Sequence, residues 1–111
     1  MLPRQSPARN HIHTIRMKTE KVAVIGMGLL GRGIAACFLG HGFNVVALAR
    51  SEQRHAEARV QIEKMVGELV DLAGFDPDLR QNWSSQFEQA TRFEQLKGCT
   101  FVVESVLEDL A

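Results

Sequence analysis

A run of apolar residues that passes directly into three spaced glycines, VAVIGMGLLGRGIA, constrains the fold of this chain more than any other feature. The run before Gly26 is continuous rather than alternating, which is typical of a parallel strand covered on both faces. Beyond Gly31 the apolar residues recur at helical spacing. A strand, a tight glycine turn and a helix in immediate succession predict the opening of a βαβ unit.

A long charged segment follows the second apolar run, NVVALA, and predicts a helix. Ser51 supplies an N-cap and Gly74 a stop. The expected buried stripe of this helix consists of the apolar residues Ala56, Val60, Met65, Leu69 and Leu72. Asp76 and Pro77 then begin a second helix. We expect it to fold back on the first helix as a hairpin, through Leu79 and Trp83.

Three shorter segments complete the pattern. QFEQAT predicts a third strand, FEQLKG a short helix, and TFVVESV a β-branched fourth strand. Alternating strands and helices predict an α/β fold with a doubly wound parallel (Rossmann) sheet, here incomplete. In the usual strand order, 3-2-1-4, the first strand is central, and a nucleotide binds at the carboxyl ends of strands one and four.

The glycines have the spacing of a dinucleotide-binding turn, G-M-G-L-L-G. Gly26 permits the sharp turn, Gly28 lets backbone N–H groups approach a pyrophosphate, and Gly31 lets the helix pack against the strand. The helix N-terminus adds partial positive charge. Because the motif joins a predicted strand to a predicted helix, we expect it to bind a dinucleotide, with Leu29 and Leu30 among the binding residues.

The residues after the second strand bear on which dinucleotide is bound. An acidic residue about twenty positions beyond the loop usually holds the ribose of NAD, but this position is Ala49. Arg50 and Ser51 follow, and a guanidinium and a hydroxyl pair well with the 2′-phosphate of NADP. The sequence therefore favours NADP over NAD. The alternative is that Arg50 and Arg54 are solvated residues at a helix start, and Ser51 is only its cap.

Two carboxylates accompany the fourth strand. Glu108 follows it and can lie beside the nicotinamide-side ribose, or can equally be a surface carboxylate. Glu104 lies inside the apolar run, where an unpaired charge is costly to bury, so a solvated surface role suits it poorly.

Composition limits the remaining classes of partner. Thirteen basic residues balance 13 acidic ones, so no strong basic surface for nucleic acid or membrane is expected. No apolar run approaches the ~18 residues of a membrane helix. Cys37 and Cys99 lack metal-ligand spacing, and we expect them to be buried, unpaired thiols in a reducing compartment, the cytoplasm. No metal site is expected.

The first 16 residues differ from the rest, with two prolines, three arginines and no acidic residue. A second methionine, Met17, begins MKTEKVAVIG, as a chain that opens on its first strand would. We therefore expect residues 1–19 to be a disordered extension and residues 20–111 to form the partial nucleotide-binding domain. His11 and His13 are expected to be solvent-exposed rather than metal ligands.

The segments KVAVIGMGLLGRGIAACFLGHGFNV and FVVESVLEDL, with the long charged helix between them, resemble the N-terminal domain of the 3-hydroxyacyl-CoA dehydrogenase family. Lambda-crystallin-type gulonate dehydrogenases share the pattern, which covers residues 21–111. The resemblance implies that the three glycines bind the pyrophosphate and that Glu108 lies near the nicotinamide ribose. Ala49 departs from the family's ribose-binding Asp, Leu30 from a usual Met, and Leu107 from a usual Pro.

The family's catalytic His–Glu pair and substrate-covering domain would lie beyond Ala111. His41, expected in a turn, and His55, expected on an exposed helix face, do not match that pair. The resemblance thus implies the cofactor-binding portion of an oxidoreductase for 3-hydroxyacyl-CoA or a related 3-hydroxy acid, inactive by itself. The alternatives are a non-catalytic nucleotide-binding or structural module, and a dehydrogenase for a short free hydroxy acid. An exposed edge on the fourth strand predicts a homo-oligomer.

Overall fold

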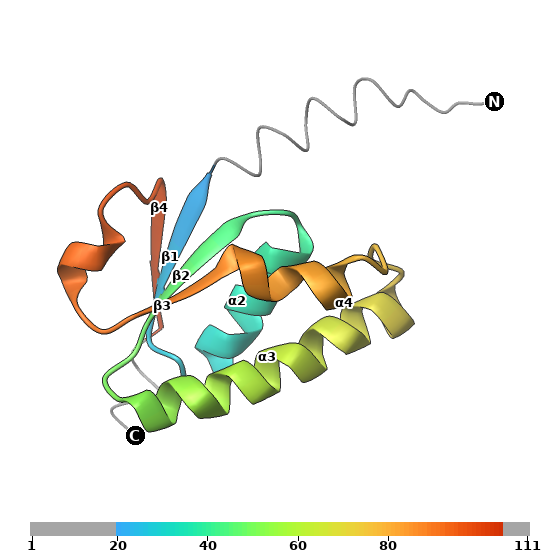
Figure 1. Ribbon diagram of the computed structural model, residues 1–111, viewed down its shortest axis with the longest axis horizontal. Helices are drawn as coiled ribbons and strands as arrows, with labels where there is room; N and C mark the ends of the chain where they lie inside the picture. Colours follow the sequence, from blue (N-terminus) through green and yellow to red (C-terminus); the bar gives the residue numbers. More distant parts are fainter. Residues whose placement is uncertain (1–19, 106–111) are drawn as a thin grey trace.

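The computed structural model of the protein describes residues 20–105. The expectations for the N-terminal extension and for Glu108 lie outside these residues. A parallel sheet of four strands has the order β3-β2-β1-β4 (Figure 1), which confirms the predicted order. The strands are β1 (Lys21–Ile25), β2 (Asn44–Leu48), β3 (Phe87–Ala90) and β4 (Phe101–Glu104).

Helices cover one face of this sheet. The longer ones are α2 (Leu29–Gly40) and α3 (Glu52–Ala73); α4 (Leu79–Asn82) continues into a 3₁₀ turn, η1 (Trp83–Gln86). The large core cluster joins alternate residues of β1 and β2 to the inner faces of these helices, and includes Val24, Leu39, Val45, Ile62 and Trp83. A smaller cluster lies on the opposite face, where a second 3₁₀ turn, η2 (Phe93–Leu96), contributes the half-buried Leu96.

The inner face of α3 is not the stripe that the apolar residues predicted. Ala58, Ile62 and Val66 are buried, whereas Val60 is 70% exposed and Leu72 is 83% exposed. Val60 precedes Ile62 by two residues, which is more than half a helical turn, so both cannot face the sheet. Several stripes fit helical spacing in this charged helix, and the sheet selects the one with small and β-branched side chains.

The helical hairpin forms as predicted but starts later. Gly74 ends α3 in the left-handed conformation, with φ of 76°. The Asp76 carboxylate then accepts the backbone N–H of Asp78 at 3.0 Å, forming a local turn that delays α4 until Leu79. Leu79 and Trp83 are buried in the large cluster, and the Arg59 guanidinium lies 5.2 Å from the centre of the Trp83 indole.

Several side chains are more exposed than the sequence predicted. Glu104 is exposed, because the outer part of β4 is open to solvent, so the expectation of a charge within a buried strand is wrong. Cys37 is exposed rather than buried, since it lies on the outer side of α2. Cys99 is half-buried, and desolvation raises the pKa of its thiol.

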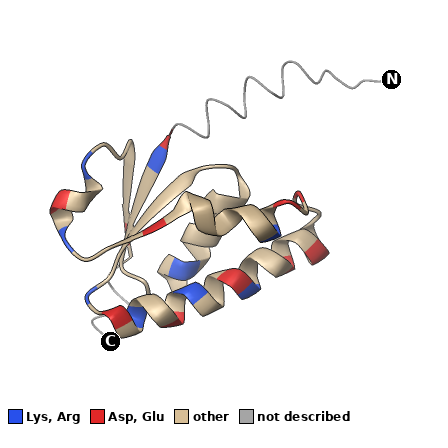
Figure 2. Cartoon of the chain, in the orientation of Figure 1, with Lys and Arg blue, Asp and Glu red and all other residues tan. Residues whose placement is uncertain are grey.

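Charged residues of both signs occur along α3, and few occur on the strands (Figure 2). No helix within residues 20–105 is at once long enough and apolar enough to cross a bilayer.

Candidate functional site

The glycine turn lies where three strands meet. Gly26 has φ of 97°, a conformation that favours glycine, so the turn requires the residue that the sequence supplies. Its backbone N–H donates to the carbonyl of Leu48 at the end of β2, at 2.9 Å. On the other side, the N–H of Ser105 donates to the carbonyl of Ile25 at 2.8 Å. The turn is therefore fixed between the carboxyl ends of β2 and β4.

Gly31 holds α2 against this turn. A Cβ atom at Gly31 would lie 1.9 Å from the carbonyl oxygen of Gly26 and 2.8 Å from Oγ of Ser105. No side chain fits in that space, so the close helix–strand packing predicted for the third glycine is present.

The first turn of α2 carries no capping side chain. Gly28 is the N-cap, with extended backbone, and its carbonyl accepts the N–H of Arg32 at 3.0 Å. The first turn of α2 contains no acidic residue. The partial positive charge of the helix N-terminus is therefore not offset by its own cap, which suits an anion.

Two side chains that the sequence did not single out hold the carbonyl groups of the turn. The buried Arg32 donates from Nε to the carbonyl oxygen of Met27 at 2.9 Å, and its Nη2 lies 3.4 Å from Oε1 of Glu57 on α3. The Ser105 hydroxyl donates to the carbonyl of Gly26 at 3.1 Å. The sequence offers one indication for Arg32: it is a charged residue in a helix that packs against a strand.

The residues expected to select the cofactor follow β2 at the same edge of the sheet. Ala49 is buried, and its N–H donates to the carbonyl of Ala90 at 3.2 Å. Arg50 is exposed. Oγ of Ser51 accepts the N–H of Arg54 at 3.1 Å, so the predicted N-cap of α3 is present. Because β1 and β2 are adjacent and parallel, this segment and the glycine turn share one edge.

His55 is buried, contrary to the expectation of an exposed histidine. Its Nε2 lies 2.8 Å from the carbonyl oxygen of Ala90, and Gln89 donates to the backbone carbonyl of His55 at 3.0 Å. A carbonyl oxygen only accepts, so Nε2 carries the proton. His55 lies on the same buried face of α3 as Ala58, Ile62 and Val66, which packs against the sheet.

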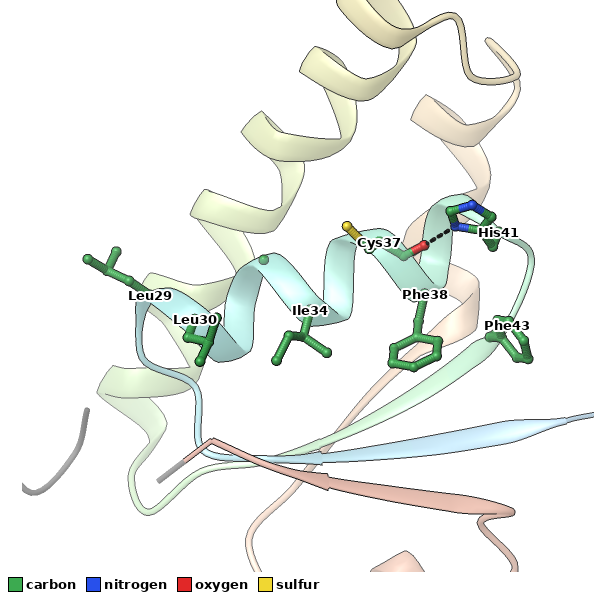
Figure 3. A pocket seen from close by; sticks show the side chains of 8 residues that line it. Leu29, Leu30, Ile34, Cys37, Phe38, His41 and Phe43 are labelled. Carbon is green, nitrogen blue, oxygen red and sulfur yellow. Dashed lines mark hydrogen bonds between the residues drawn. The ribbon is translucent and has the colours of Figure 1, made fainter. Parts of the chain in front are cut away.

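An apolar groove of about 600 Å³ begins at the turn and runs along α2, and Leu30, Ile34 and Phe38 point from α2 toward the strands (Figure 3). It is lined by Leu29, Leu30, Gly33, Ile34, Cys37, Phe38, His41 and Phe43. Within the groove, Nδ1 of His41 lies 2.8 Å from the backbone carbonyl oxygen of Cys37, and a dashed line marks this contact (Figure 3). Among the residues that the structure describes, no cluster of three metal-ligating side chains is found. The edge can hold an anion, and the groove can hold apolar groups.

A family model and a curated relative both relate this chain to the 3-hydroxyacyl-CoA dehydrogenases. Residues 21–111 match the family model described as 3-hydroxyacyl-CoA dehydrogenase, NAD binding domain. The 3-hydroxybutyryl-CoA dehydrogenase of Clostridioides difficile is 27% identical over 90 residues, which are 81% of this chain and 32% of that protein.

Solved structures of similar proteins have the same fold. FadB2 of M. tuberculosis superposes with a TM-score of 0.72 at 26% identity, over 81% of this chain and 32% of that one. The 3-hydroxybutyryl-CoA dehydrogenase of Escherichia coli K12 superposes with a TM-score of 0.68 at 25% identity, over 77% of this chain and 18% of that one. The chain thus spans about a third, or less, of the length of these relatives.

Proposed function

The chain belongs to the family of 3-hydroxyacyl-CoA dehydrogenase NAD-binding domains, and on this premise we propose that its glycine turn binds the pyrophosphate of a nicotinamide dinucleotide. The observation that carries the proposal is the turn itself, with positive φ at Gly26 and a helix held so close that Gly31 admits no side chain. Such a turn at an uncapped helix N-terminus fits a dianionic pyrophosphate.

Backbone groups do most of the binding in this proposal. The N–H groups from Gly28 through Leu29, Leu30 and Gly31 are those nearest the helix N-terminus, where partial positive charge is greatest. Leu29 and Leu30 also begin the apolar groove, so their side chains border the space beside the bound dinucleotide. Glu108 is proposed to contact the nicotinamide ribose, on the basis of the family resemblance.

We further propose that NADP is preferred over NAD. Ala49 offers no carboxylate to the ribose hydroxyls, and the exposed Arg50 can pair with a 2′-phosphate. Ser51 uses its oxygen as an acceptor in the helix cap, so its hydroxyl proton is the group that would donate to the phosphate.

A titration of the protein with NADPH and with NADH tests both proposals. We expect NADPH to bind about tenfold more tightly, the value of one charge-assisted contact. Arg50→Asp should remove or reverse this preference, and Ala49→Asp should improve NADH binding. Lys64→Met, which removes one exposed charge farther along α3, is the matched control and should leave the ratio unchanged.

Two outcomes contradict these proposals separately. Equal binding of the two cofactors, or tighter binding of NADH, would show that Arg50 does not read the 2′-phosphate. Binding of neither cofactor would contradict the nucleotide-binding proposal itself.

For the whole enzyme, we propose an oxidoreductase that transfers hydride between the nicotinamide and a 3-hydroxyacyl-CoA or related 3-hydroxy acid. The relatives named as 3-hydroxybutyryl-CoA dehydrogenases support this substrate class, but this chain aligns with only 32% and 18% of their lengths. In the part of the chain that the structure describes, the charged pair beside the glycine turn is Arg32 and Glu57, and Arg32 binds a backbone carbonyl of the turn. We therefore propose that this chain supplies the cofactor half-site and is inactive alone.

The state of the protein in the cell is also a proposal. The exposed apolar edge of β4 supports association with a second copy. Two free cysteines, Cys37 and Cys99, suit a reducing compartment such as the cytoplasm.

A further inference from the structure

We infer that Arg32 and Ser105 are positioning residues that direct the N–H groups of the glycine turn toward the pyrophosphate. This inference rests on the proposed function of the turn. It assigns a role in dinucleotide binding to two side chains that need not touch the ligand, one on α2 and one at the end of β4.

Two carbonyl groups of the turn, those of Gly26 and Met27, accept hydrogen bonds from buried side chains. Nε of Arg32 donates to the carbonyl of Met27 at 2.9 Å. The hydroxyl of Ser105 donates to the carbonyl of Gly26 at 3.1 Å. Arg32 and Ser105 are 8% and 5% exposed, so each bond is shielded from competing water.

Because each peptide unit is planar, a hydrogen bond that fixes its carbonyl also fixes the direction of its N–H group. In a trans peptide, the carbonyl and the N–H that follows it point in opposite directions, and the described residues contain no cis peptide bond. Holding the carbonyl of Met27 therefore turns the N–H of Gly28 away from Arg32. Holding the carbonyl of Gly26 likewise turns the N–H of Met27 away from Ser105.

Without these contacts, rotation of either peptide plane would point a carbonyl oxygen at the anion. A glycine-rich turn permits such rotation, because glycine lacks the steric restriction of a Cβ atom. The hydrogen bonds from Arg32 and Ser105, the two tethers of the turn, remove this alternative before the ligand arrives, so less conformational entropy is lost on binding.

Glu57 connects this arrangement to the other half of the site. It accepts from Arg32 at 3.4 Å and from Gln53, in the first turn of α3, at 3.4 Å. Arg32 thus joins the phosphate turn to the helix that Ser51 caps. Because the Glu57 side chain is half exposed, the Arg32 charge is only partly neutralised and adds positive potential beneath the turn.

Binding of ADP-ribose and of adenosine, measured by titration for each variant, separates positioning from general destabilisation. Arg32→Met should weaken ADP-ribose binding about tenfold or more, the value of one hydrogen bond to a charged group. Arg32→Lys keeps the charge but cannot donate in the same geometry, and should recover only part of the loss. Ser105→Ala should weaken ADP-ribose binding by a smaller factor, about threefold, as for a neutral hydrogen bond.

Adenosine lacks the pyrophosphate, so its affinity should change less than about twofold in every variant. Lys64→Met again serves as the charge-matched control and should bind both ligands as the unaltered protein does. Thermal unfolding by circular dichroism identifies variants that are folded at the titration temperature.

The outcomes distinguish this inference from the function on which it rests. If the unaltered protein binds ADP-ribose and folded Arg32 and Ser105 variants bind it equally well, the positioning role is overturned while the proposed function stands. A parallel loss of adenosine affinity would likewise overturn it, because the effect would not depend on the phosphates. If the unaltered protein does not bind ADP-ribose, both fail.

Discussion

The two strands that flank β1 have the same partner but different surroundings. β2 and β4 both pair with β1 in parallel over consecutive residues. Four of the five β2 residues are buried, whereas Phe101 and Val102 of β4 are 54% and 55% exposed. The ladder to β1 is parallel on both sides, but β2 also pairs with β3 whereas β4 is the edge strand of the described sheet. The two strands also differ in the cover that α2, α3 and α4 supply.

This difference shows that an apolar strand is not buried by pairing alone. Side chains of a sheet point above and below it, and only packed layers remove them from water. On the β2 side, the helical hairpin provides that layer through Ile62, Val66 and Trp83. On the β4 side, α2 presents the apolar groove, and only Val103 of β4 packs against the large cluster.

The largest expected loss of stability comes from a substitution in the core that the helices cover beside β2. Ile62→Ala should lower the free energy of unfolding by about 2–5 kcal/mol, because it removes a fully buried side chain and leaves a cavity. Val102→Ala on β4 should lower it by less than about 0.5 kcal/mol. Urea denaturation of the two variants measures both values. Similar losses would mean that β4 is covered in solution.

A smaller effect tests the polar contact that joins α3 to β3. His55→Leu should cost about 1 kcal/mol, because the carbonyl of Ala90 loses the donor at Nε2 but keeps the N–H of Ala49. The exposed His41 offers a matched control, and His41→Gln should stay within about 0.5 kcal/mol of the unaltered protein. The same denaturation measurement applies. If His55→Leu leaves the free energy of unfolding unchanged, the hydrogen bond to Ala90 does not contribute to holding α3 against the sheet.

The smallest change in stability is expected for a substitution on β4 that should reduce self-association of the protein. Val102→Lys places a charge on the β4 edge, as natural edge strands often do, and should shift sedimentation toward monomer with less than about 0.5 kcal/mol change in stability. Leu72→Lys makes the same kind of change at an 83% exposed position of α3 and should leave association unaltered. A protein that is already monomeric at high concentration would contradict association through β4.

The sheet and the helical hairpin could be predicted from the sequence, because they depend on local patterns. The continuous apolar runs, the glycines at 26, 28 and 31, and the cap at Ser51 each specify structure within a few residues. The face of α3 could not be predicted in this way, since several stripes fit helical spacing and the rotation depends on the contact with the sheet. The same dependence explains why His55 is buried although its sequence position predicts an exposed residue.

The tethers of the glycine turn could not be predicted because their partners are distant or hidden. Ser105 and Gly26 are 79 residues apart in the sequence, so no local sequence pattern predicts their hydrogen bond. Arg32 is only five residues from Met27, but a charged residue in a helix is ordinarily expected to face solvent. The apolar neighbours of Glu104 predict a buried strand, but the open side of β4 leaves Glu104 exposed.

The two tethers also differ in when they can form during folding. The Arg32 contact closes a loop of five residues, whereas the Ser105 contact must wait until β4 docks beside β1. Loop closure over a long separation costs more entropy, and non-local strand pairing is slow. The turn therefore gains one fixed carbonyl early and the other only when β4 is added to the sheet. During synthesis, a fully ordered turn requires that Ser105 has left the ribosome, so the last described strand sets the moment at which the first turn is complete.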